Sequence, residues 1–404
     1  MSKLSELIKE LCPEGVEFKP LGAVAKIKNG RDYKHLAEGD IPVYGSGGIM
    51  TYVDSFTYDK PSVLLPRKGS LNNVFFVDVP FWNVDTIFYT EINENIMLPK
   101  FFYYLMAKEN LAELNMAGGV PSLTQTTLNS IKIPVPPLAV QEEIVKILDL
   151  FADYAAELQA ELQARKEQYE YYRNLLLTFN PSACGSGAEE AQKLDNVSTQ
   201  PSGTYNTIWR PMGAIGTFIR GNGLQKKDFT ESGVGCIHYG QIYTYYGTFA
   251  TKTKSYVSPN FATKLKKASH GDIVIATTSE NVEDVGKAVA WLGNNDIAVS
   301  GDAYIFKHNQ NPKYIAYLFQ THRFDDFKKM NVTGTKVTRI SGDALAKFEI
   351  PVPPLEEQAR IVSILDRFEA LTNDLQKGLP AEIAAVKEQY EYYRNKLLTF
   401  KQLA

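Results

Sequence analysis

The sequence predicts an α+β protein in which two globular, mixed α/β domains are joined by two long helices that form an antiparallel coiled coil. Two observations predict this fold. "IPVPPLAVQEEIVKILDLF" at 133–151 returns as "IPVPPLEEQARIVSILDRF" at 350–368. After each copy, apolar residues recur every three or four positions, as they do along a coiled-coil helix. The chain therefore carries one plan twice, as a pseudo-twofold internal duplication.

The duplication extends to both ends of each copy. The nine residues "KEQYEYYRN" occur unchanged at 166–174 and 387–395, and "FKPLGAVA" at 18–25 resembles "WRPMGAIG" at 209–216. The segments between these ends differ, as expected after duplication followed by specialisation. The predicted divisions are a first domain at 1–132, a helix at 133–179, a linker at 180–204, a second domain at 205–349 and a second helix at 350–404.

Length and composition are consistent with this organisation. A chain of 404 residues can form two ordinary domains with cores of their own. No apolar run approaches the roughly 18 residues of a membrane span, and the first residues lack the apolar core of a signal peptide, so we expect a cytoplasmic protein. Cys12, Cys184 and Cys236 form no CxxC pair and are expected to be ordinary thiols.

The two domains show short strand-like runs and one helix each. The runs "PSVLLPRKGSLNNVFFVDV" and "GDIVIATTSENVEDVGKAVAWLG" are rich in β-branched and aromatic residues and are broken by Gly, Asn and Pro. Residues 98–114 and 311–327 each predict an amphipathic helix that begins after a proline.

Each repeated tail predicts a long helix with a heptad seam. A helix of about 39 residues would span roughly 58 Å. The second copy has four extra residues near "KGLPAE", where Gly378 and Pro380 predict a kink or a local break. The seam residues are Ile144, Leu148, Phe151, Ala155, Leu158, Leu162, Arg165, Tyr169, Tyr172, Leu176 and Phe179, and then Ile361, Leu365, Phe368, Thr372, Leu375, Leu379, Ile383, Val386, Tyr390, Tyr393, Leu397 and Phe400.

The sequence carries no signature of catalysis. It lacks the GxxxxGK[ST] loop for nucleotide phosphates, the HExxH zinc motif and an NPPY-like methyltransferase tetrad. The five histidines show no metal-ligand spacing. The glycine-rich stretches "YGSGG" at 44–48 and "GNG" at 221–223 lack the context of a dinucleotide loop and predict turns.

Charge suggests a polyanionic partner for the second domain and does not exclude one for the first. Residues 205–349 hold 18 basic and 12 acidic side chains, a net charge of +6, whereas residues 1–132 have a net charge of −2. In both domains basic residues are interleaved with amides and aromatics, which suits phosphate and base-edge contacts, although each residue taken singly also fits a solvated surface. The candidate DNA-binding residues are Lys26, Lys28, Arg31, Lys34, Arg67, Lys68, Ser70, Asn72, Arg220, Gln225, Lys226, Lys227, Tyr239, Gln241, Tyr243, Lys252, Lys254, Lys336 and Arg339.

The repeated "IPVPPL" and "KEQYEYYRN" segments, each preceded by a dissimilar globular region, resemble the specificity (S, HsdS) subunit of type I restriction-modification systems. The resemblance implies two target recognition domains that each read one half of a bipartite duplex DNA target. It implies that the paired helices set the spacer and dock two methyltransferase subunits. It also implies no catalytic residues in this chain, because the partners bring S-adenosylmethionine and, with restriction subunits, ATP and Mg²⁺.

The repeats also suggest where partner subunits would bind. Gln141 and Gln358 stand in corresponding places, and the off-seam residues Glu170, Arg173, Glu391 and Arg394 belong to the identical nine-residue segment. Two equal docking sites would explain identity beyond the seam, and so would a recent duplication. A two-headed coiled-coil scaffold that binds protein and not DNA stays open as the alternative, and a nuclease is disfavoured because no carboxylate cluster for a metal is evident.

Overall fold

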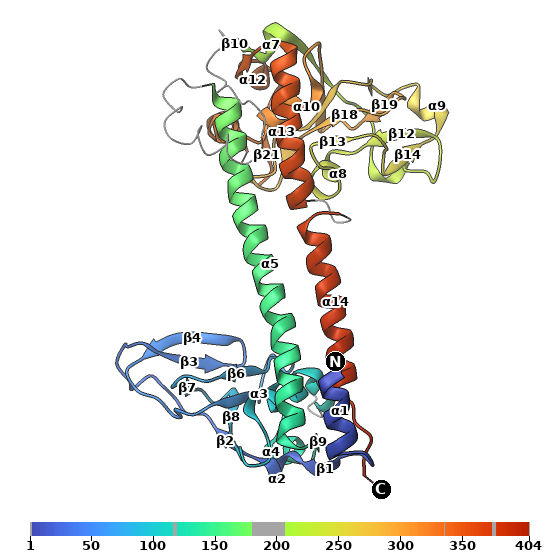
Figure 1. Cartoon of the computed structure of the whole chain (residues 1–404). Coiled ribbons are helices and arrows are strands. Elements are labelled where there is room, and N and C mark those ends of the chain that lie inside the picture. The colour runs from blue at the N-terminus through green and yellow to red at the C-terminus, as the bar shows by residue number, and fades with distance from the viewer. Residues whose placement is uncertain (1, 116–118, 180–206, 335, 374–376, 404) are drawn as a thin grey trace. The chain divides into compact units, whose positions relative to one another are not determined.

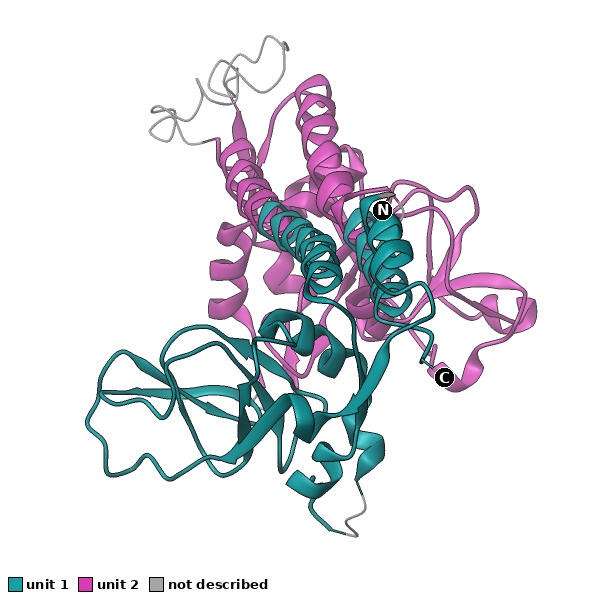
Figure 2. Cartoon of the chain, turned by 60° about the horizontal axis from the view of Figure 1, so that its bottom comes forward, with its two compact units in different colours: residues 1–161, 381–404 teal, residues 162–380 magenta. Residues whose placement is uncertain are grey.

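The computed structural model describes residues 2–115, 119–179, 207–334, 336–373 and 377–403. The chain divides into two compact units, Met1–Glu161 with Ala381–Ala404 (unit 1) and Leu162–Pro380 (unit 2), which are coloured separately in Figure 2. Each unit therefore contains one predicted globular domain together with part of each helical repeat. The predicted linker at 180–204 lies outside the described residues.

Unit 1 is built on a four-stranded sheet in the order β2-β8-β5-β6. Strand β5 is covered on both faces, because its residues Val63, Leu64 and Leu65 are all fully buried. Val63 and Leu65 face a core shared with the helices, whereas Leu64 faces a second core on the opposite side. The strands are β2 (Ala25–Asn29), β5 (Ser62–Pro66), β6 (Phe75–Val77) and β8 (Ile87–Ile92).

A smaller sheet and several helices complete unit 1. The smaller sheet has the order β4-β3-β7, and its β3–β4 pair is a tight antiparallel hairpin (Figure 1). Its turn, at Ser46 and Gly47, confirms the turn predicted from "YGSGG". The further elements are β3 (Ile41–Gly45), β4 (Gly48–Val53), β7 (Trp82–Asn83), α1 (Ser2–Leu11), α2 (Leu21–Val24), α3 (Pro99–Lys108), η1 (Leu111–Leu114) and α4 (Gln125–Asn129).

Unit 2 repeats the central part of this plan. Its five-stranded sheet has the order β11-β20-β16-β18-β13, and the antiparallel trio β11-β20-β16 matches β2-β8-β5 of unit 1. A four-stranded sheet, β14-β12-β19-β15, and the pair β17-β21 are added to it. The strands are β11 (Gly216–Arg220), β12 (Val234–Ile237), β13 (Phe249–Ala250), β14 (Ser255–Val257), β15 (Lys267–Ala268), β16 (Ile273–Ala276), β17 (Thr278–Ser279), β18 (Ala288–Trp291), β19 (Ile297–Val299), β20 (Ala303–His308) and β21 (Thr338–Arg339).

The central sheet of unit 2 also separates two cores. Ile273 and Ile275 of β16 pack into the core that contains the helices, and Val274 and Ala276 pack into the opposite core. This is the two-residue alternation of a strand buried on both faces. The short helices of unit 2 are α7 (Met212–Ile215), η4 (Lys226–Asp228), α8 (Tyr239–Thr244), α9 (Pro259–Ala262), α10 (Pro312–Leu318), α11 (His322–Asn331) and α12 (Gly342–Ala346).

The repeated sequence at the two ends of each copy forms one ladder in each unit. In unit 1, β1 (Glu17–Pro20) pairs antiparallel with β9 (Lys132–Val135). In unit 2, β10 (Ile208–Pro211) pairs in the same way with β22 (Glu349–Val352). The similar sequences therefore lie at the point where each globular domain closes and its long helix begins.

The long helices match the prediction in most respects. Helix α5 (Leu138–Thr178) has 41 residues and begins five residues after Ile133, because the first residues of the repeat form β9. In the second copy, α13 (Leu355–Asn373) ends before α14 (Leu379–Leu397) begins. The interruption predicted at Gly378 and Pro380 is confirmed, since Gly378 lies before the second helix and Pro380 lies in its first turn, where its missing N–H is tolerated.

Within each unit, segments of the two repeats pack along the predicted seams. In unit 1 the first part of α5 lies beside α14, and the rings of Phe151 and Tyr393 stack with centroids 5.4 Å apart (Figure 1). In unit 2 Tyr169 and Tyr172 of α5 both stack on Phe368 of α13, at 6.2 and 5.6 Å. The predicted antiparallel coiled coil is confirmed, and its aromatic seam residues are its contacts.

The two amphipathic helices predicted at 98–114 and 311–327 are each broken into two pieces. In unit 1 the chain is extended at Glu109, between α3 and η1. In unit 2 Thr321 has extended backbone angles and its side chain accepts a hydrogen bond from Phe324 N–H, so it caps a new helix, α11. Apolar spacing alone did not reveal these breaks.

Each unit fastens one domain helix, α3 or α10, to a helix of the repeat with the same polar group. In unit 1 the Asp149 carboxylate accepts hydrogen bonds from Lys100 Nζ at 2.7 Å and Tyr104 Oη at 2.6 Å. In unit 2 the Asp366 carboxylate accepts them from Lys313 Nζ and Tyr317 Oη, both at 2.7 Å. Burial raises the pKa of both tyrosines most, followed by the Asp149 hydrogen bond at Tyr104 and by the charge of Glu369 at Tyr317, so each remains a hydrogen-bond donor.

A buried histidine makes the stability of unit 2 depend on pH. His308 accepts a hydrogen bond at Nδ1 from Gln310 N–H, and its Nε2 is buried without a partner. Burial lowers its pKa to about 4, although the nearby Asp272 acts in the opposite direction. Below the ordinary histidine pKa of about 6.5 the unfolded chain takes up a proton that the folded chain refuses.

We therefore expect unit 2 to lose stability as the pH falls from about 6.5 to about 4, by at most about 3 kcal/mol from this group. The replacement His308→Phe should remove this part of the pH dependence, because phenylalanine keeps the ring but does not titrate. Urea unfolding of both proteins at pH 7.5 and pH 5 measures the difference. An equal loss in both proteins would contradict the assignment to His308.

Candidate nucleic-acid interface

The structure brings three predicted basic residues of unit 1 together around the segment that precedes β8. Arg31 N–H donates to Asn83 O at 2.9 Å. Arg67 Nη1 donates to Asp85 O at 3.1 Å, and Lys68 Nζ lies 3.5 Å from the Asp85 carboxylate. Arg67 is half-buried and the other two are exposed, so this cluster, Arg31, Arg67 and Lys68, gathers basic residues at one end of the strands β2, β8 and β5, with Lys68 paired to Asp85.

The other unit 1 candidates lie nearby in sequence but differ in availability. Lys26 is exposed on β2, whereas Lys28 on the same strand is 3.6 Å from the Glu91 carboxylate. Asn72 Oδ1 accepts a hydrogen bond from Ala112 N–H, so this side chain supports η1. Lys34 and Ser70 are exposed.

Unit 2 gathers its candidates around the equivalent segment before β20. Arg220 Nε donates to Gly301 O at 2.9 Å, and Tyr239 N–H donates to Ser300 Oγ at 2.9 Å. Tyr243 Oη donates to Thr278 O at 2.6 Å, and Thr278 is the register partner of Arg339 in the β17–β21 pair. Arg220 and Arg339 are exposed and supply the positive charge.

Two glycines show that these clusters are structurally equivalent. A Cβ on Gly30 would lie 2.0 Å from Val84 O, and a Cβ on Gly221 would lie 2.2 Å from Ser300 O. Only glycine permits this approach of backbone to backbone. Gly30 follows β2 and Gly221 follows β11, so both units hold this turn against the segment before the central strand, with Arg31 just after the glycine in unit 1 and Arg220 just before it in unit 2.

The remaining unit 2 candidates lie on the surrounding loops. Gln225 caps η4, which carries the exposed side chains of Lys226 and Lys227. The charge of Lys226 adds to the effect of burial in lowering the pKa of His238, which precedes α8. Lys252, Lys254 and Lys336 are exposed, and the Lys254 ammonium lies 4.6 Å from the centroid of the Tyr245 ring.

One predicted base-reading residue is used inside the fold. Gln241 is only 9% exposed, its Oε1 accepts from His238 N–H at 3.0 Å, and its Nε2 donates to Ser255 Oγ at 2.7 Å. Both ends of the amide are therefore occupied. Gln241 holds the start of α8 in place, which positions Tyr239 and Tyr243 in the cluster.

Two of the predicted partner-binding residues are also buried. Gln141 and Gln358 have no exposed surface. Gln141 Oε1 accepts from Leu98 N–H, and its Nε2 donates to Ile96 O and Pro136 O. Gln358 makes the matching contact with Asn311 N–H and donates to Pro353 O. These amides fasten each long helix to its domain and leave no surface for a partner.

The other four predicted partner-binding residues belong to the identical helix segments. Arg173 lies over the ring of Tyr169 at 5.1 Å, and Arg394 lies over the ring of Tyr390 at 5.5 Å. Glu170 is exposed and pairs with His322 Nε2 at 2.7 Å, and Glu391 is exposed. The two segments thus hold their arginines alike, while their glutamates have different surroundings.

The internal repeat also includes a segment before each long helix that was not predicted from the sequence. Val120–Val135 and Val337–Val352 keep the same offset of 217 residues as the helical repeats. Thr124 and Ser341 are equivalent helix N-caps, each accepting a backbone hydrogen bond three residues later. Leu123 N–H bonds to Arg67 O, and Ile340 N–H bonds to Thr277 O. In the sequence, the signals for this segment are a few matching apolar residues and the matching helix N-caps Thr124 and Ser341.

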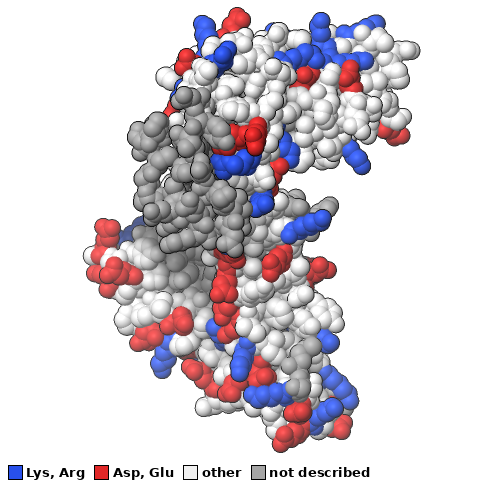
Figure 3. Space-filling model, turned by 45° about the horizontal axis from the view of Figure 1, so that its top comes forward, with Lys and Arg blue, Asp and Glu red and all other residues white. Residues whose placement is uncertain are grey.

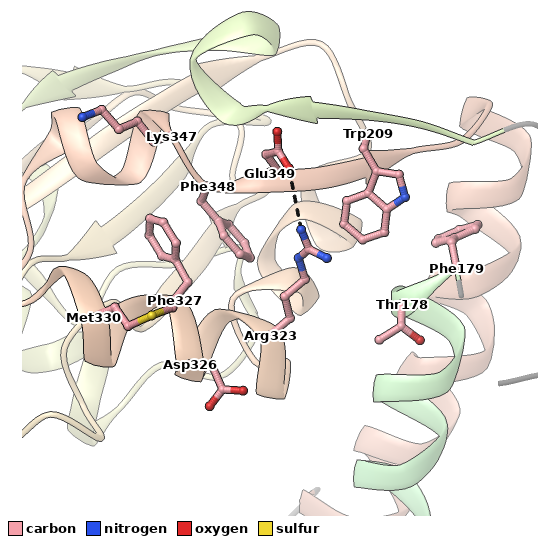
Figure 4. A pocket seen from close by; sticks show the side chains of 10 residues that line it. All are labelled: Thr178, Phe179, Trp209, Arg323, Asp326, Phe327, Met330, Lys347, Phe348 and Glu349. Atoms are coloured by element: carbon pink, nitrogen blue, oxygen red, sulfur yellow. Dashed lines mark ion pairs between the residues drawn. The ribbon is translucent and has the colours of Figure 1, made fainter. Parts of the chain in front are cut away.

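Unit 2 also contains a cavity of about 850 Å³, shown in Figure 4. The Arg323 guanidinium lies 4.1 Å from the Trp209 ring centroid and 3.9 Å from the Glu349 carboxylate. Phe327, Met330 and other largely apolar side chains form much of the remaining wall. Because Arg323 is paired with Glu349 and much of the wall is apolar, the cavity offers packing surface more than a set of groups for chemistry.

Figure 3 shows basic and acidic side chains interspersed on the face in view. Among the described residues, no group of three or more His, Cys, Asp or Glu side chains is placed to hold a metal ion. Across the same residues, no helix has the length and apolar character needed to cross a membrane.

Comparison with known proteins places this arrangement in a family. Residues 13–168 and 210–385 each match the family described as "Type I restriction modification DNA specificity domain". The two matches fall on the two copies of the plan. The chain belongs to the type I restriction-modification specificity subunits.

Relatives of this specificity subunit are similar over nearly their whole length. A putative type I restriction enzyme specificity subunit of Haemophilus influenzae is 31% identical, covering 95% of this chain and 96% of the relative. The EcoR124I/EcoR124II specificity subunit of Escherichia coli is 30% identical, covering 99% of this chain and 98% of the relative.

Solved structures share the fold of this specificity subunit. The S subunit of a type I restriction-modification system from M. genitalium has a TM-score of 0.55 at 14% identity, covering 95% of this chain and 96% of that one. A chain from a structure on assembly and conformational transition of the type I system has a TM-score of 0.58 at 17% identity, covering 96% and 98%. Both support the duplicated architecture.

Proposed function

We propose that each unit of this specificity subunit reads one half of a bipartite duplex DNA target. The observation that carries the proposal is the equivalence of the two basic clusters. In both units an arginine beside a tightly packed glycine turn, Arg31 or Arg220, lies against the segment that precedes the central strand. Basic side chains at these edges can neutralise phosphates, while neighbouring amide and hydroxyl groups can contact base edges.

The paired helices are proposed to set the distance between the half-sites and to dock two methyltransferase subunits. Helix α5, with 41 residues, has a length of about 62 Å at 1.5 Å per residue. The chain itself would be non-catalytic, and the partners would bring S-adenosylmethionine and, with restriction subunits, ATP and Mg²⁺. Membership in a DNA specificity family does not favour the alternative of a scaffold that binds protein alone.

Salt-dependent DNA binding tests the proposal. The subunit assembled with its methyltransferase subunits should bind its target duplex more tightly than a scrambled duplex of equal length. The logarithm of the association constant should fall linearly with the logarithm of the salt concentration, because phosphate contacts release counterions. Equal binding of target and scrambled DNA at every salt concentration would favour the scaffold.

The exposed glutamates of the identical helix segments provide a test of the docking sites. Glu170→Lys and Glu391→Lys are each expected to weaken binding of one methyltransferase subunit by about tenfold or more, because reversing a charge in a polar interface costs several kcal/mol when it meets a like charge. Size-exclusion chromatography with mass measurement would then show one lost subunit per variant. Glu161→Lys, on the same helix but outside the identical segment, is the matched control. Full assembly of both variants would refute these two sites.

A further inference from the structure

The β3–β4 hairpin of unit 1 exposes several apolar side chains. Ile49 is 49% exposed, Met50 is 57% exposed and Tyr52 is 49% exposed, all on β4. The next strand residue, Val53, is 3% exposed, so the hairpin is anchored at its far end. Because successive strand residues point to opposite faces, Met50 and Tyr52 share one face of the hairpin and Ile49 lies on the other. Exposed apolar side chains gathered on one hairpin often mark a contact with another molecule.

Gly47, at the tip of the same hairpin, is a glycine that folding does not require. A Cβ built at this position meets no atom within 4 Å, and its φ angle is not positive. Gly48 differs, since its φ of +114° favours glycine. A glycine free of both constraints points to close approach by a ligand, which a side chain would obstruct.

Hydrogen bonds join the tip to the basic cluster of unit 1. Ser46 N–H donates to Thr86 Oγ1 at 3.2 Å, and Thr86 O accepts from both Arg67 and Lys68 N–H. Asn73 Nδ2, from the loop that carries these basic residues, donates to Ser46 O at 2.9 Å. These hydrogen bonds hold the tip of the hairpin beside the backbone of Arg67 and Lys68, so the tip and two residues of the basic cluster are neighbours.

We propose that the segment Ser46–Met50 is a specificity element that contacts thymine methyl groups in the half-site read by unit 1. This inference rests on the proposed function and names its ligand chemistry. The adjacent cations suit a polyanion. Among base edges in the major groove of DNA, the thymine C5-methyl is the apolar group that a methionine or isoleucine side chain can cover. The glycine tip lets the backbone approach the groove.

Replacement of thymine by uracil provides the test, because it removes only the methyl group. With the assembled complex and its mapped target, substituting one thymine at a time should lower affinity about fourfold at one or more positions, the effect of about 0.8 kcal/mol for one buried methyl group. Met50→Ser should abolish the thymine preference at such a position. Leu11→Ser, a control at an exposed apolar residue of α1, should retain it.

Gly47 variants test the close approach separately. Gly47→Ala and Gly47→Leu should leave the melting temperature unchanged and lower target affinity progressively, with at least tenfold loss for leucine. The inference is overturned if Gly47→Leu binds normally, if Met50→Ser keeps the thymine preference, or if the unaltered complex shows none. A complex that fails to distinguish target from scrambled DNA would instead overturn the proposed function.

Discussion

Replacing Arg31, Arg67 and Lys68 together with alanine is expected to lower the affinity of the assembled complex for its target DNA on the order of a hundredfold at physiological salt. The backbone of Arg31 and the side chains of Arg67 and Lys68 contact the segment before β8, which places the three residues around one stretch of chain. Each lost phosphate contact should also reduce the slope of log affinity against log salt by about one. Fluorescence anisotropy at several salt concentrations measures both effects.

A matched variant distinguishes this cluster from general surface charge. Lys9→Ala with Lys132→Ala removes two exposed positive charges from unit 1 at positions outside the cluster, on α1 and β9. It should leave the affinity within about threefold of the original, since scattered surface charges contribute little once screened by salt. If the control loses as much affinity for DNA as the cluster variant, the positive charge of unit 1 attracts DNA without a defined binding site.

The second large effect is expected on stability. Gln141→Ala should destabilise unit 1 by about 3–5 kcal/mol, because it leaves Leu98 N–H, Ile96 O and Pro136 O without their buried partner. Gln358→Ala should have a comparable effect on unit 2. Gln159→Ala, at an exposed position on α5, is the control and should change stability by less than about 0.5 kcal/mol.

Urea unfolding followed by circular dichroism measures these differences in the free energy of unfolding. The result also decides whether Gln141 and Gln358 stabilise the fold or bind a partner subunit. A loss of methyltransferase binding with unchanged stability would contradict the buried arrangement and restore them as partner-binding residues.

The helices were predictable because their signals are local and periodic. The seam residues Tyr169 and Phe368 are separated by 199 positions, yet each belongs to a regular heptad series, so their pairing follows from two independent patterns. The break before Leu379 also has a local cause in Gly378 and Pro380. The duplication strengthened both predictions. The same heptad pattern occurs in both copies, and aligning the copies shows four extra residues near the break in the second one.

The candidate site was less predictable because burial and long-range hydrogen bonds decide it. Gln141 and Gln241 have the composition of surface recognition residues, but both are enclosed and fully used within the fold. The cluster of Arg31 with Arg67 depends on β2 and β5 flanking β8, a strand order that residue types do not encode. The shared N-caps Thr124 and Ser341 were hidden because few identical residues surround them.

Mapping methylated adenines tests the central claim most directly. The subunit would be expressed with its methyltransferase subunits in a host that lacks other adenine methylation, and modified positions would be read across the genome. Two short half-sites separated by a spacer of fixed length and variable sequence are the predicted result. A single uninterrupted motif, or methylation without any shared sequence, would contradict recognition of one half-site by each unit.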